Sequence, residues 1–146
     1  MNNRRRVLFV CTANSARSLM AEALLKGLAD DQFEVASAGT SPSKPHPLAL
    51  QCIEEAGLDS SAARSKSVAS VGDTHWDYVI TLCDKAAHEC QPIASVGQVI
   101  AWDFPDPVPN NRHSTFALVM KELKDRISLF VLVHQKTGHR SIHYPP

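Results

Sequence analysis

The sequence predicts an α/β protein with a mostly parallel sheet that is covered on both faces. Short apolar segments of strand length alternate with longer segments whose apolar residues recur at helical spacing. Two of the apolar segments end directly on a cysteine, and no repeat or low-complexity tract interrupts the alternation. Strands that alternate with helices form βαβ units, whose strands run parallel.

The first half of the chain supplies two such units. Residues 7–10 read Val-Leu-Phe-Val, a continuous apolar run typical of a strand buried on both faces. Residues 18–28 place apolar side chains on one helical face and charged side chains on the other. Residues 33–38 are predicted as the next strand, and residues 47–56 as a helix that stops at Gly57.

The second half repeats the pattern. Residues 78–82 form a strand-like run that ends on a cysteine, and residues 96–102 are a further strand candidate. The proline-rich residues 104–109 are predicted as a loop. Residues 114–136 carry apolar side chains at helical spacing and are predicted as a long terminal helix on the sheet, followed by a frayed tail at 139–146.

Length and composition indicate a single domain over residues 1–146, because 146 residues with 44% hydrophobic content suffice for one core. The formal net charge is zero, which argues against binding of nucleic acid or of an anionic membrane. No apolar segment approaches the ~20 residues that a membrane span needs, and no signal peptide is recognisable. We therefore expect a cytoplasmic protein with a small-molecule partner.

The four cysteines are Cys11, Cys52, Cys83 and Cys90. In a chain without a secretion signal, cysteines are more often catalytic, metal-binding or buried than part of a disulfide framework. Cys52 lies among apolar residues of a predicted helix, so we interpret it as a core residue.

Cys11, Cys83 and Asp106 all follow the carboxyl ends of predicted strands, where open α/β sheets bind their ligands. The loop after Cys11 should curl so that its backbone N–H groups point inward, and the next helix adds the positive end of its dipole. Such a cradle binds a tetrahedral oxyanion and stabilises a thiolate. The predicted oxyanion-binding residues are Thr12, Ala13, Asn14, Ser15, Ala16 and Arg17.

Individual roles follow from the side chains. Arg17 offers a planar fork of donors that can hold two oxygens of the anion. Ser18 can donate a hydrogen bond to the Cys11 sulfur, and Asn14 can hold the shape of the loop. The alternative is a buried cysteine with an unrelated arginine six residues later, but the flanking strand and amphipathic helix favour the functional interpretation.

The segment from Val7 to Ala23, Val-Leu-Phe-Val-Cys-Thr-Ala-Asn-Ser-Ala-Arg-Ser-Leu-Met-Ala-Glu-Ala, resembles the opening of the low-molecular-weight protein tyrosine phosphatase superfamily. The resemblance covers nearly the whole chain, including Ser37-Ala-Gly39 and Asp106-Pro107. It implies a flavodoxin-like three-layer sandwich with a four-stranded parallel sheet and helices on both faces. One branch of this superfamily hydrolyses phosphotyrosine, and the other contains arsenate reductases that pass oxidation through further cysteines to thioredoxin.

Residues 79–90 resemble the redox segment of thioredoxin-coupled arsenate reductases in placement and spacing. The resemblance implies that Cys11 attacks arsenate, that Asp106 protonates the leaving oxygen, and that Cys83 then attacks the Cys11 sulfur and expels arsenite. Cys90 would resolve that disulfide, and a thioredoxin-like protein would reduce the Cys83–Cys90 product. Asp103 is a rival for the acid, but Asp106-Pro107 matches the acid loop of the family.

The relay has a geometric consequence. Seven residues of helix separate two cysteines by about 10 Å, beyond the roughly 7 Å between Cα atoms that a disulfide spans. If residues 83–90 are helical when reduced, oxidation should convert them to a loop that exposes the disulfide. Equal circular dichroism and exchange protection in both redox forms would contradict this hypothesis.

Two departures from the family bear on substrate and ions. The phosphatase branch usually carries a tyrosine beside the acid loop, whereas Val108-Pro109-Asn110 follows here, which argues against phosphotyrosine.

Some reductases bind potassium near the cradle through side chains that Asn14, Glu22 and Ser37 match. Lys66 stands at the expected acidic position, so we predict that its ammonium replaces the ion and that no metal is required.

Three alternatives to the reductase remain. A phosphatase would hydrolyse phosphomonoesters through a Cys11 phosphocysteine without using Cys83 or Cys90. A binding module would keep the fold without activity, although Cys11, Arg17 and Asp106 are all present. A metal site among His134, His139 and His143 matches no common zinc spacing. Neither enzyme branch needs an organic cofactor.

Overall fold

The computed structural model describes residues 4–83 and 95–134 of the chain. Within these residues, the strands form one four-stranded parallel sheet in the order β2-β1-β3-β4. The strands are β1 (Arg5–Cys11), β2 (Phe33–Gly39), β3 (His75–Thr81) and β4 (Ser95–Ala101). Because every pair is parallel, the carboxyl ends of the strands meet at one edge, where Cys11 lies opposite Gly39 in the register.

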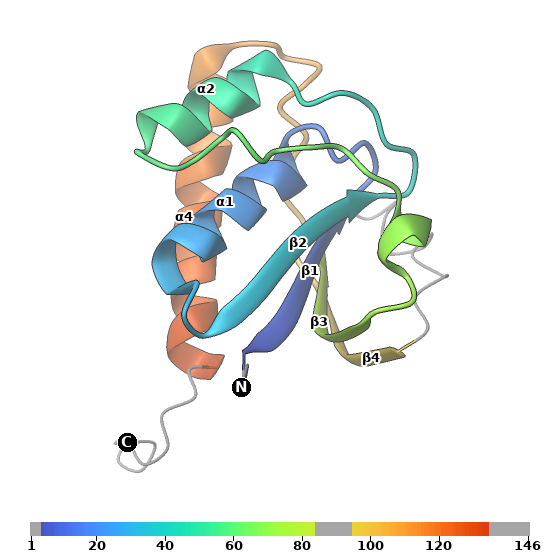
Figure 1. Ribbon diagram of the computed structural model, residues 1–146. Coiled ribbons are helices and arrows are strands. Elements are labelled where there is room, and N and C mark those ends of the chain that lie inside the picture. Colours follow the sequence, from blue (N-terminus) through green and yellow to red (C-terminus); the bar gives the residue numbers. More distant parts are fainter. Residues whose placement is uncertain (1–3, 84–94, 135–146) are drawn as a thin grey trace.

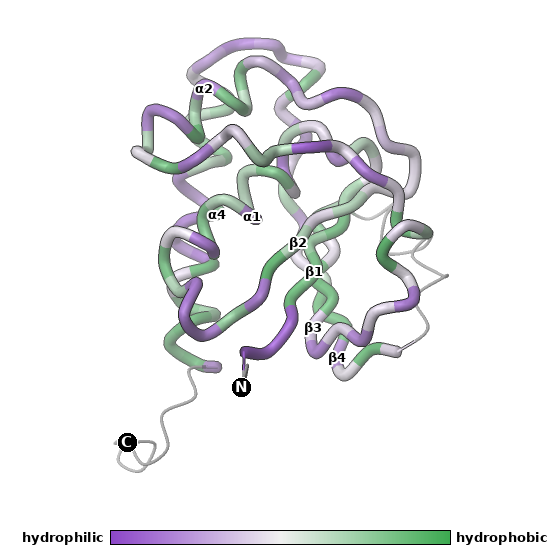
Figure 2. The backbone as a smooth tube through the Cα atoms, viewed as in Figure 1, coloured by the Kyte–Doolittle hydropathy of each residue, from purple (hydrophilic) through white to green (hydrophobic). Residues whose placement is uncertain are grey.

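The α-helices α1 (Arg17–Ala29), α2 (Pro47–Glu55) and α4 (His113–His134) pack on one face of the sheet (Figure 1). There they enclose the main core together with alternate residues of β1, such as Phe9. The other face presents Leu8 and Val10 and is covered by the 3-10 helix η1 (Val68–Val71). The sheet is therefore the middle layer of three, as expected for the flavodoxin-like fold, and Figure 2 shows its central strands as mostly hydrophobic.

Local signals account for the limits of α2. Pro47 stands at the first helical position, and the Nδ1 atom of the capping His46 accepts a hydrogen bond from the Leu48 N–H group at 3.1 Å. At the other end Gly57 has a φ of 76°, and the N–H groups of Gly57 and Leu58 return to the carbonyls of Glu54 and Ile53. This is a Schellman ending, which confirms the predicted stop at Gly57.

The predicted elements are present, with shifted limits. β1 extends beyond residues 7–10 to Arg5–Cys11, because its backbone pairs with β2 over that whole length. β3 begins at His75, and the predicted strand at 96–102 begins and ends one residue earlier. The helix η1 was not predicted; it begins where the Ser67 hydroxyl accepts a hydrogen bond from the Ser70 N–H group at 3.3 Å.

Part of the prediction falls on residues that the structure does not describe. These include all but the first residue of the segment 83–90, with Cys90 in it, the end of the helix predicted to reach residue 136, and the tail. Among the helices that are described, none combines the length and the apolar character that crossing a membrane requires.

Cys52 is a core residue, as predicted, with 4% of its surface exposed. Burial raises the pKa of its thiol above the ordinary value of 9.0, and the Glu55 carboxylate adds to the rise. A raised folded-state pKa contributes stability that is complete below the unfolded-state value and is lost as the pH rises through the folded-state value.

We therefore expect the stability advantage of the wild type over a Cys52→Ala variant to shrink above pH 9.0, the ordinary thiol value. In this range the unfolded chain releases the thiol proton while the folded chain retains it. The measurement is the free energy of urea unfolding of both proteins from neutral to alkaline pH. A difference that stays constant with pH would contradict the prediction.

Candidate active site

Cys11 ends β1, and the five residues after it form the loop that leads into α1. A pocket of about 200 Å³ opens at this point, on the carboxyl edge of the sheet. Its lining consists of Cys11, Thr12, Ala13, Ser15, Ala16, Arg17, Ser43, Asp106 and Val108. The pocket thus brings together the predicted nucleophile, most of the predicted cradle and the predicted acid.

The carbonyl groups of Cys11 and of loop residues 12–15 all accept hydrogen bonds from protein donors. The N–H groups of Thr40, Ser41, Ser43 and His46 donate to the carbonyls of Cys11, Thr12, Ala13 and Ser15 at 2.8–3.3 Å, and the Ser65 hydroxyl donates to the Asn14 carbonyl at 2.6 Å. In a trans peptide the carbonyl and the following N–H group point in opposite directions, and no described peptide bond is cis. The N–H groups of residues 12–16 are therefore turned away from these donors.

Gly39 allows the close approach between this loop and β2. A Cβ atom at Gly39 would lie 2.7 Å from the Thr12 carbonyl oxygen and 3.0 Å from the Asn14 nitrogen. Any side chain there would push the loop out of its path. From the sequence, Gly39 stood out only as part of the Ser37-Ala-Gly39 segment that resembles the family.

Asn14 does not line the pocket, because its side chain is fully buried behind the loop. It has a left-handed φ of 49°, a conformation that asparagine tolerates better than most residues. Its Nδ2 group donates to Ser18 Oγ at 2.7 Å and to Ser37 Oγ at 3.0 Å, and its Oδ1 atom accepts from the Lys66 N–H group at 2.9 Å. This agrees with its predicted role in holding the loop and leaves only its N–H group for an anion.

Ser18 lies 3.0 Å from the Cys11 sulfur through its hydroxyl oxygen. Since that oxygen accepts a hydrogen bond from Asn14, its own proton is available for the sulfur. Both side chains are almost completely buried. The contact predicted from the sequence is present and suits a sulfur that carries negative charge.

A series of polar contacts leads from Asn14 through Ser37 and Glu22 to Lys26 at the surface. Ser37 donates to Glu22 Oε1 at 2.5 Å, and Glu22 Oε2 lies 2.9 Å from Lys26 Nζ. The prediction that the Lys66 ammonium takes this position is corrected: Lys66 Nζ lies 3.4 Å from the Arg64 carbonyl, and Lys26 forms the ion pair. Lys26 reaches Glu22 because the two are one helical turn apart in α1.

The Glu22 carboxylate nevertheless affects the pKa of Lys66. Burial lowers the pKa of its ammonium, and the Glu22 carboxylate opposes that fall. The oxygens of Glu22 and the Oδ1 atom of Asn14 are already engaged by protein donors. A potassium ion therefore does not fit this set of residues unless Lys26 moves away.

We expect exchange of sodium for potassium at constant ionic strength to leave the turnover and the thermal midpoint of the wild type unchanged. In a Lys26→Met variant the nearly buried Glu22 loses its counter-charge, so we expect a loss of ~1–3 kcal/mol in stability that potassium partly restores. Lys66→Met is the matched control, because the Lys66 contact to Asn14 comes from the backbone. A potassium dependence in the wild type would contradict the prediction.

Arg17 is the first residue of α1, and its side chain is 9% exposed. No side chain caps this helix, so its first N–H groups face the pocket end without a side-chain partner. The Arg17 Nη1 group donates to the Phe104 carbonyl at 3.0 Å, and Nη2 lies 3.7 Å from Asp106 Oδ2. These contacts orient the guanidinium across the mouth of the cradle.

The structure separates the two candidate acids. Asp106 lines the pocket and approaches Arg17, while Asp103 lines a different cavity beside α4. Asp106 Oδ1 also accepts a hydrogen bond from the Val108 N–H group at 3.1 Å, which fixes the carboxyl within its own loop. The geometry therefore favours Asp106, the residue chosen from the Asp-Pro pair.

The acid loop is held from α4 by Arg126, which sequence reasoning missed. The Arg126 guanidinium lies 5.3 Å from the Trp102 ring centre and 5.7 Å from that of Phe104. Cation–π contacts of this kind add to the packing of the aromatic rings. The Phe104 carbonyl also accepts a hydrogen bond from Arg17. The contact of Arg126 with Phe104 therefore links α4 to the residue that orients Arg17.

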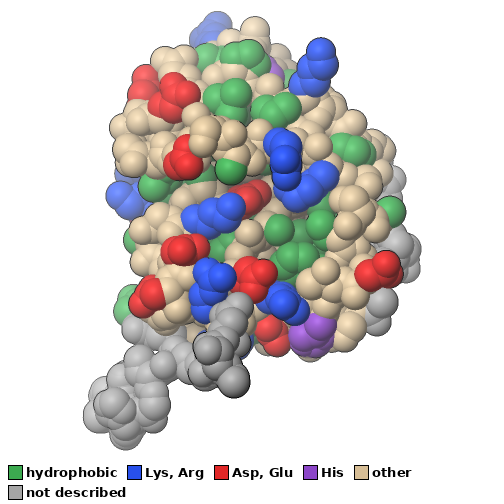
Figure 3. Space-filling view, in the orientation of Figure 1, with side chains coloured by type: hydrophobic (Ala, Val, Ile, Leu, Met, Phe, Trp, Pro, Cys, Tyr) green, Lys and Arg blue, Asp and Glu red, His purple; other side chains and the backbone are tan. Residues whose placement is uncertain are grey.

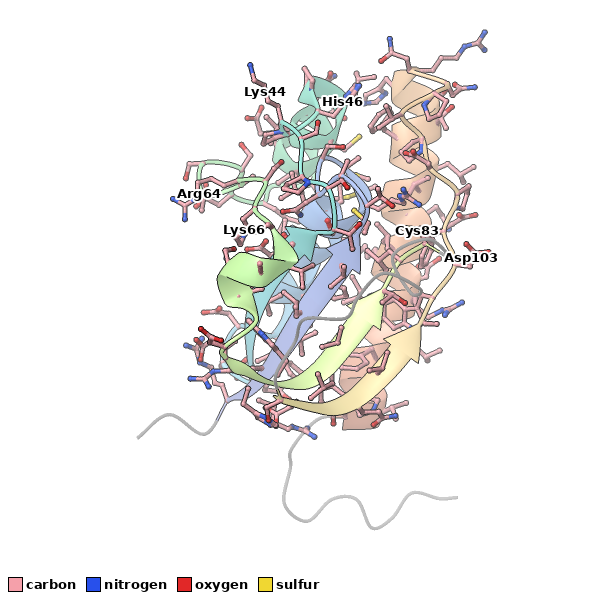
Figure 4. All side chains as sticks on the ribbon, turned by 90° about the vertical axis from the view of Figure 1, so that its right-hand side faces the viewer. Lys44, His46, Arg64, Lys66, Cys83 and Asp103 are labelled. Carbon is pink, nitrogen blue, oxygen red and sulfur yellow. The ribbon has the colours of Figure 1, made fainter. Side chains whose placement is uncertain are left out.

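Cys83 follows β3 at the same edge of the sheet as Cys11 (Figure 4). Its sulfur lies 3.4 Å from Thr12 Oγ1, so a residue of the cradle contacts the second thiol directly. Figure 4 also places Asp103 beyond the end of β4. The Thr12 contact could not be predicted, because seventy-one positions separate the two residues in the chain.

The rim of the pocket carries Ser43 and Val108, and none of the described residues that line it is aromatic. This agrees with the absence of a tyrosine after Asp106-Pro107 in the sequence. Positive side chains, namely Lys44, Arg64 and Lys66, project from the loops beside the sheet edge in Figure 4. Figure 3 shows lysine and arginine side chains gathered near the middle of its face, over β2 and the segment after α2.

The fold and the loop between β1 and α1 define a known class of enzymes. Residues 6–139 match the family model of low molecular weight phosphotyrosine protein phosphatases, so the chain belongs to this family. The membership agrees with the resemblance found in the first loop.

Within the family, several of the similar proteins carry the name of the reductase branch. An arsenate reductase of Halalkalibacterium halodurans is 32% identical over 133 residues, which are 88% of this chain and 96% of that protein. A solved arsenate reductase in its phosphate-binding state has a TM-score of 0.79 and 29% identity, covering 88% of this chain and 98% of its own. A thioredoxin-dependent arsenate reductase of Corynebacterium glutamicum has a TM-score of 0.67 and 28% identity, covering 89% of this chain and 61% of its own longer chain.

Proposed function

We propose that the protein is a thioredoxin-dependent arsenate reductase that acts in the cytoplasm. The observation that carries the proposal is the second thiol at the cradle, since Cys83 Sγ lies 3.4 Å from Thr12 Oγ1. A hydrolytic phosphatase has no use for a thiol at this position. The names of several similar proteins support the same branch, as does the lack of aromatic side chains among the described residues of the pocket lining.

Arsenate binds in the pocket as a tetrahedral oxyanion. The N–H groups of residues 12–16 and the first turn of α1 donate to its oxygens, and Arg17 holds two of them with its fork. The bound arsenic then faces the Cys11 sulfur. A thiolate is the attacking form, and the hydroxyl of Ser18 stabilises it at 3.0 Å.

In the first step the Cys11 thiolate forms a bond to arsenic(V), and one oxygen leaves as water. Asp106 supplies the proton for that oxygen, and its position beside Arg17 at 3.7 Å brings it to the anion. No electrons are transferred in this step. The product is a Cys11 thiolate–arsenate adduct.

In the second step the Cys83 thiolate attacks the Cys11 sulfur. The electron pair of the sulfur–arsenic bond passes to arsenic, which leaves as arsenic(III), and a Cys11–Cys83 disulfide forms. Cys90, which lies outside the described residues, then attacks the Cys83 sulfur and releases the Cys11 thiolate. The Cys83–Cys90 disulfide is reduced by the dithiol of a thioredoxin-like protein, which takes up the oxidation.

Hydrolysis of phosphomonoesters is the second candidate function. The pocket holds Cys11, Arg17 and Asp106 together, which are sufficient to form and hydrolyse a phosphocysteine, and phosphate shares the shape and charge of arsenate. This function makes no use of Cys83 or Cys90.

The deciding experiment measures arsenate reduction with thioredoxin, thioredoxin reductase and NADPH in the wild type, Cys83→Ser and Cys90→Ser. We expect both variants to lose steady-state turnover, while Cys90→Ser still releases one arsenite per enzyme and stops at the Cys11–Cys83 disulfide. Cys52→Ser is the matched control and should keep turnover. A wild type without turnover, together with aryl phosphate hydrolysis that both variants retain, would identify a phosphatase instead.

A further inference from the structure

A second group of reactive side chains lies away from the pocket, where α2 and α4 meet. Cys52 and Glu55 come from α2, and His113 is the first residue of α4. One ligand atom from each, namely a sulfur, a carboxylate oxygen and a ring nitrogen, lies within 4.8 Å of the others. The proposed reaction uses none of these residues.

The spacing along α2 explains the arrangement. Cys52 and Glu55 are three positions apart, so their side chains project from neighbouring points of the helix surface. Cys52 is 4% exposed and fixed in the core, whereas the side chains of Glu55 and His113 are 51% and 43% exposed. The group therefore has one rigid ligand inside and two adjustable ligands that open to solvent.

The residues are already drawn together. His113 Nε2 lies 2.7 Å from Glu55 Oε1, and the Gln51 amide donates to Glu55 Oε2 at 3.0 Å. Gln51 thus holds the carboxylate from behind and leaves the oxygen beside His113 and Cys52 for a further partner. Hydrogen bonds to the outer atom of a ligand are typical of the shell around bound metals.

We propose that Cys52, Glu55 and His113 bind a divalent cation of the zinc class and thereby clamp α2 to α4. Thiolate, imidazole and carboxylate are the three ligand types that zinc uses, and the thiolate disfavours calcium and magnesium. Three protein ligands leave one position of a tetrahedron for water.

Bond lengths of about 2.0–2.3 Å place tetrahedral ligand atoms roughly 3.5 Å apart. On binding, ligand atoms that are now up to 4.8 Å apart approach each other, while His113 Nε2 and Glu55 Oε1, now 2.7 Å apart, separate. The two exposed side chains can make this movement. The cation displaces the proton between His113 and Glu55, and this proton and that of the Cys52 thiol both pass to the solvent on binding. No redox change is involved.

The test isolates Cys52 from the other cysteines. The full chain with Cys11→Ser, Cys83→Ser and Cys90→Ser retains Cys52 alone, and it is titrated with cobalt(II). We expect a thiolate-to-cobalt charge-transfer band that zinc(II) abolishes by displacement, together with a higher thermal midpoint in zinc. When Cys52→Ser is added to this parent variant, the charge-transfer band should disappear. No band in the parent would overturn the proposal.

Two further variants separate a three-ligand site from a single reactive cysteine. His113→Ala and Glu55→Gln change exposed side chains, so folding should persist, and each should weaken cobalt affinity at least about tenfold. His75→Ala is the matched control, since His75 is another exposed histidine with a carboxylate partner, Asp77. Equal affinity in His113→Ala, Glu55→Gln and the parent would overturn the proposal. This outcome is independent of arsenate reduction, because the parent lacks Cys11.

Discussion

In a Cys11→Ser variant, the rate of arsenate reduction is expected to fall by at least about 10⁴-fold, because the covalent nucleophile is removed. A serine hydroxyl is a much weaker nucleophile than a thiolate, and it can form neither the adduct nor the disulfide with Cys83. The measurement is NADPH oxidation coupled to thioredoxin. Aryl phosphate hydrolysis should fall in parallel, because both reactions begin at the same sulfur.

The control for this prediction is Cys52→Ser, which makes the same chemical change in the core on α2. It should lower the thermal midpoint without a comparable loss of turnover. Thermal unfolding of Cys11→Ser, with and without phosphate, shows whether the cradle still binds an oxyanion. Turnover of Cys11→Ser within about tenfold of the wild type would rule out Cys11 as the nucleophile.

An Arg17→Lys variant is expected to lower kcat/KM for arsenate by about 10²–10³-fold although the charge is conserved. Lysine carries a single ammonium group and cannot hold two oxygens in a plane. It also cannot keep both the 3.0 Å contact to the Phe104 carbonyl and the approach of 3.7 Å to Asp106. The fall should appear in kcat as well as in KM, because the fork follows the anion into the transition state.

Arg64→Lys is the matched control, since Arg64 is exposed on a loop beside the same edge of the sheet. It should change kcat/KM little, apart from its dependence on salt. Wild-type kcat/KM in Arg17→Lys would show that only positive charge matters at Arg17. A loss in thermal midpoint that matches the loss of activity would assign Arg17 a structural role.

The sequence identified most elements because their signals are local. Apolar runs located the strands, and Pro47 and Gly57 set the ends of α2 through their own backbone preferences. The helix η1 was missed because four residues carry too little periodicity, although Ser67 at its start is a capping signal. The length of β1 was underestimated because pairing with β2 continues past its apolar residues.

The residues of the site also divide into those that local sequence predicts and those that only the folded structure identifies. Cys11, Arg17 and Ser18 are contiguous in the chain, so strand, loop and helix predict their meeting. Asp106 could be chosen over Asp103 only through the family resemblance, and the structure adds the contact with Arg17. The choice of Lys66 failed because side-chain reach decided it: Lys26 is one turn from Glu22, while Lys66 turns its ammonium toward Arg64.

By itself the sequence determined the class of fold, the nucleophile and its cradle, because these depend on periodicity and on residues close together in the chain. Only the tertiary structure decided which distant groups contact that cradle. These groups are Cys83 beside Thr12, the Phe104 carbonyl beside Arg17, and the N–H groups of the 40–46 segment that donate to the loop carbonyls. It also brought Cys52 and Glu55 to His113. The physical reason is that contacts between distant segments depend on how the helices pack on the sheet, and packing is set by the whole core rather than by any local pattern.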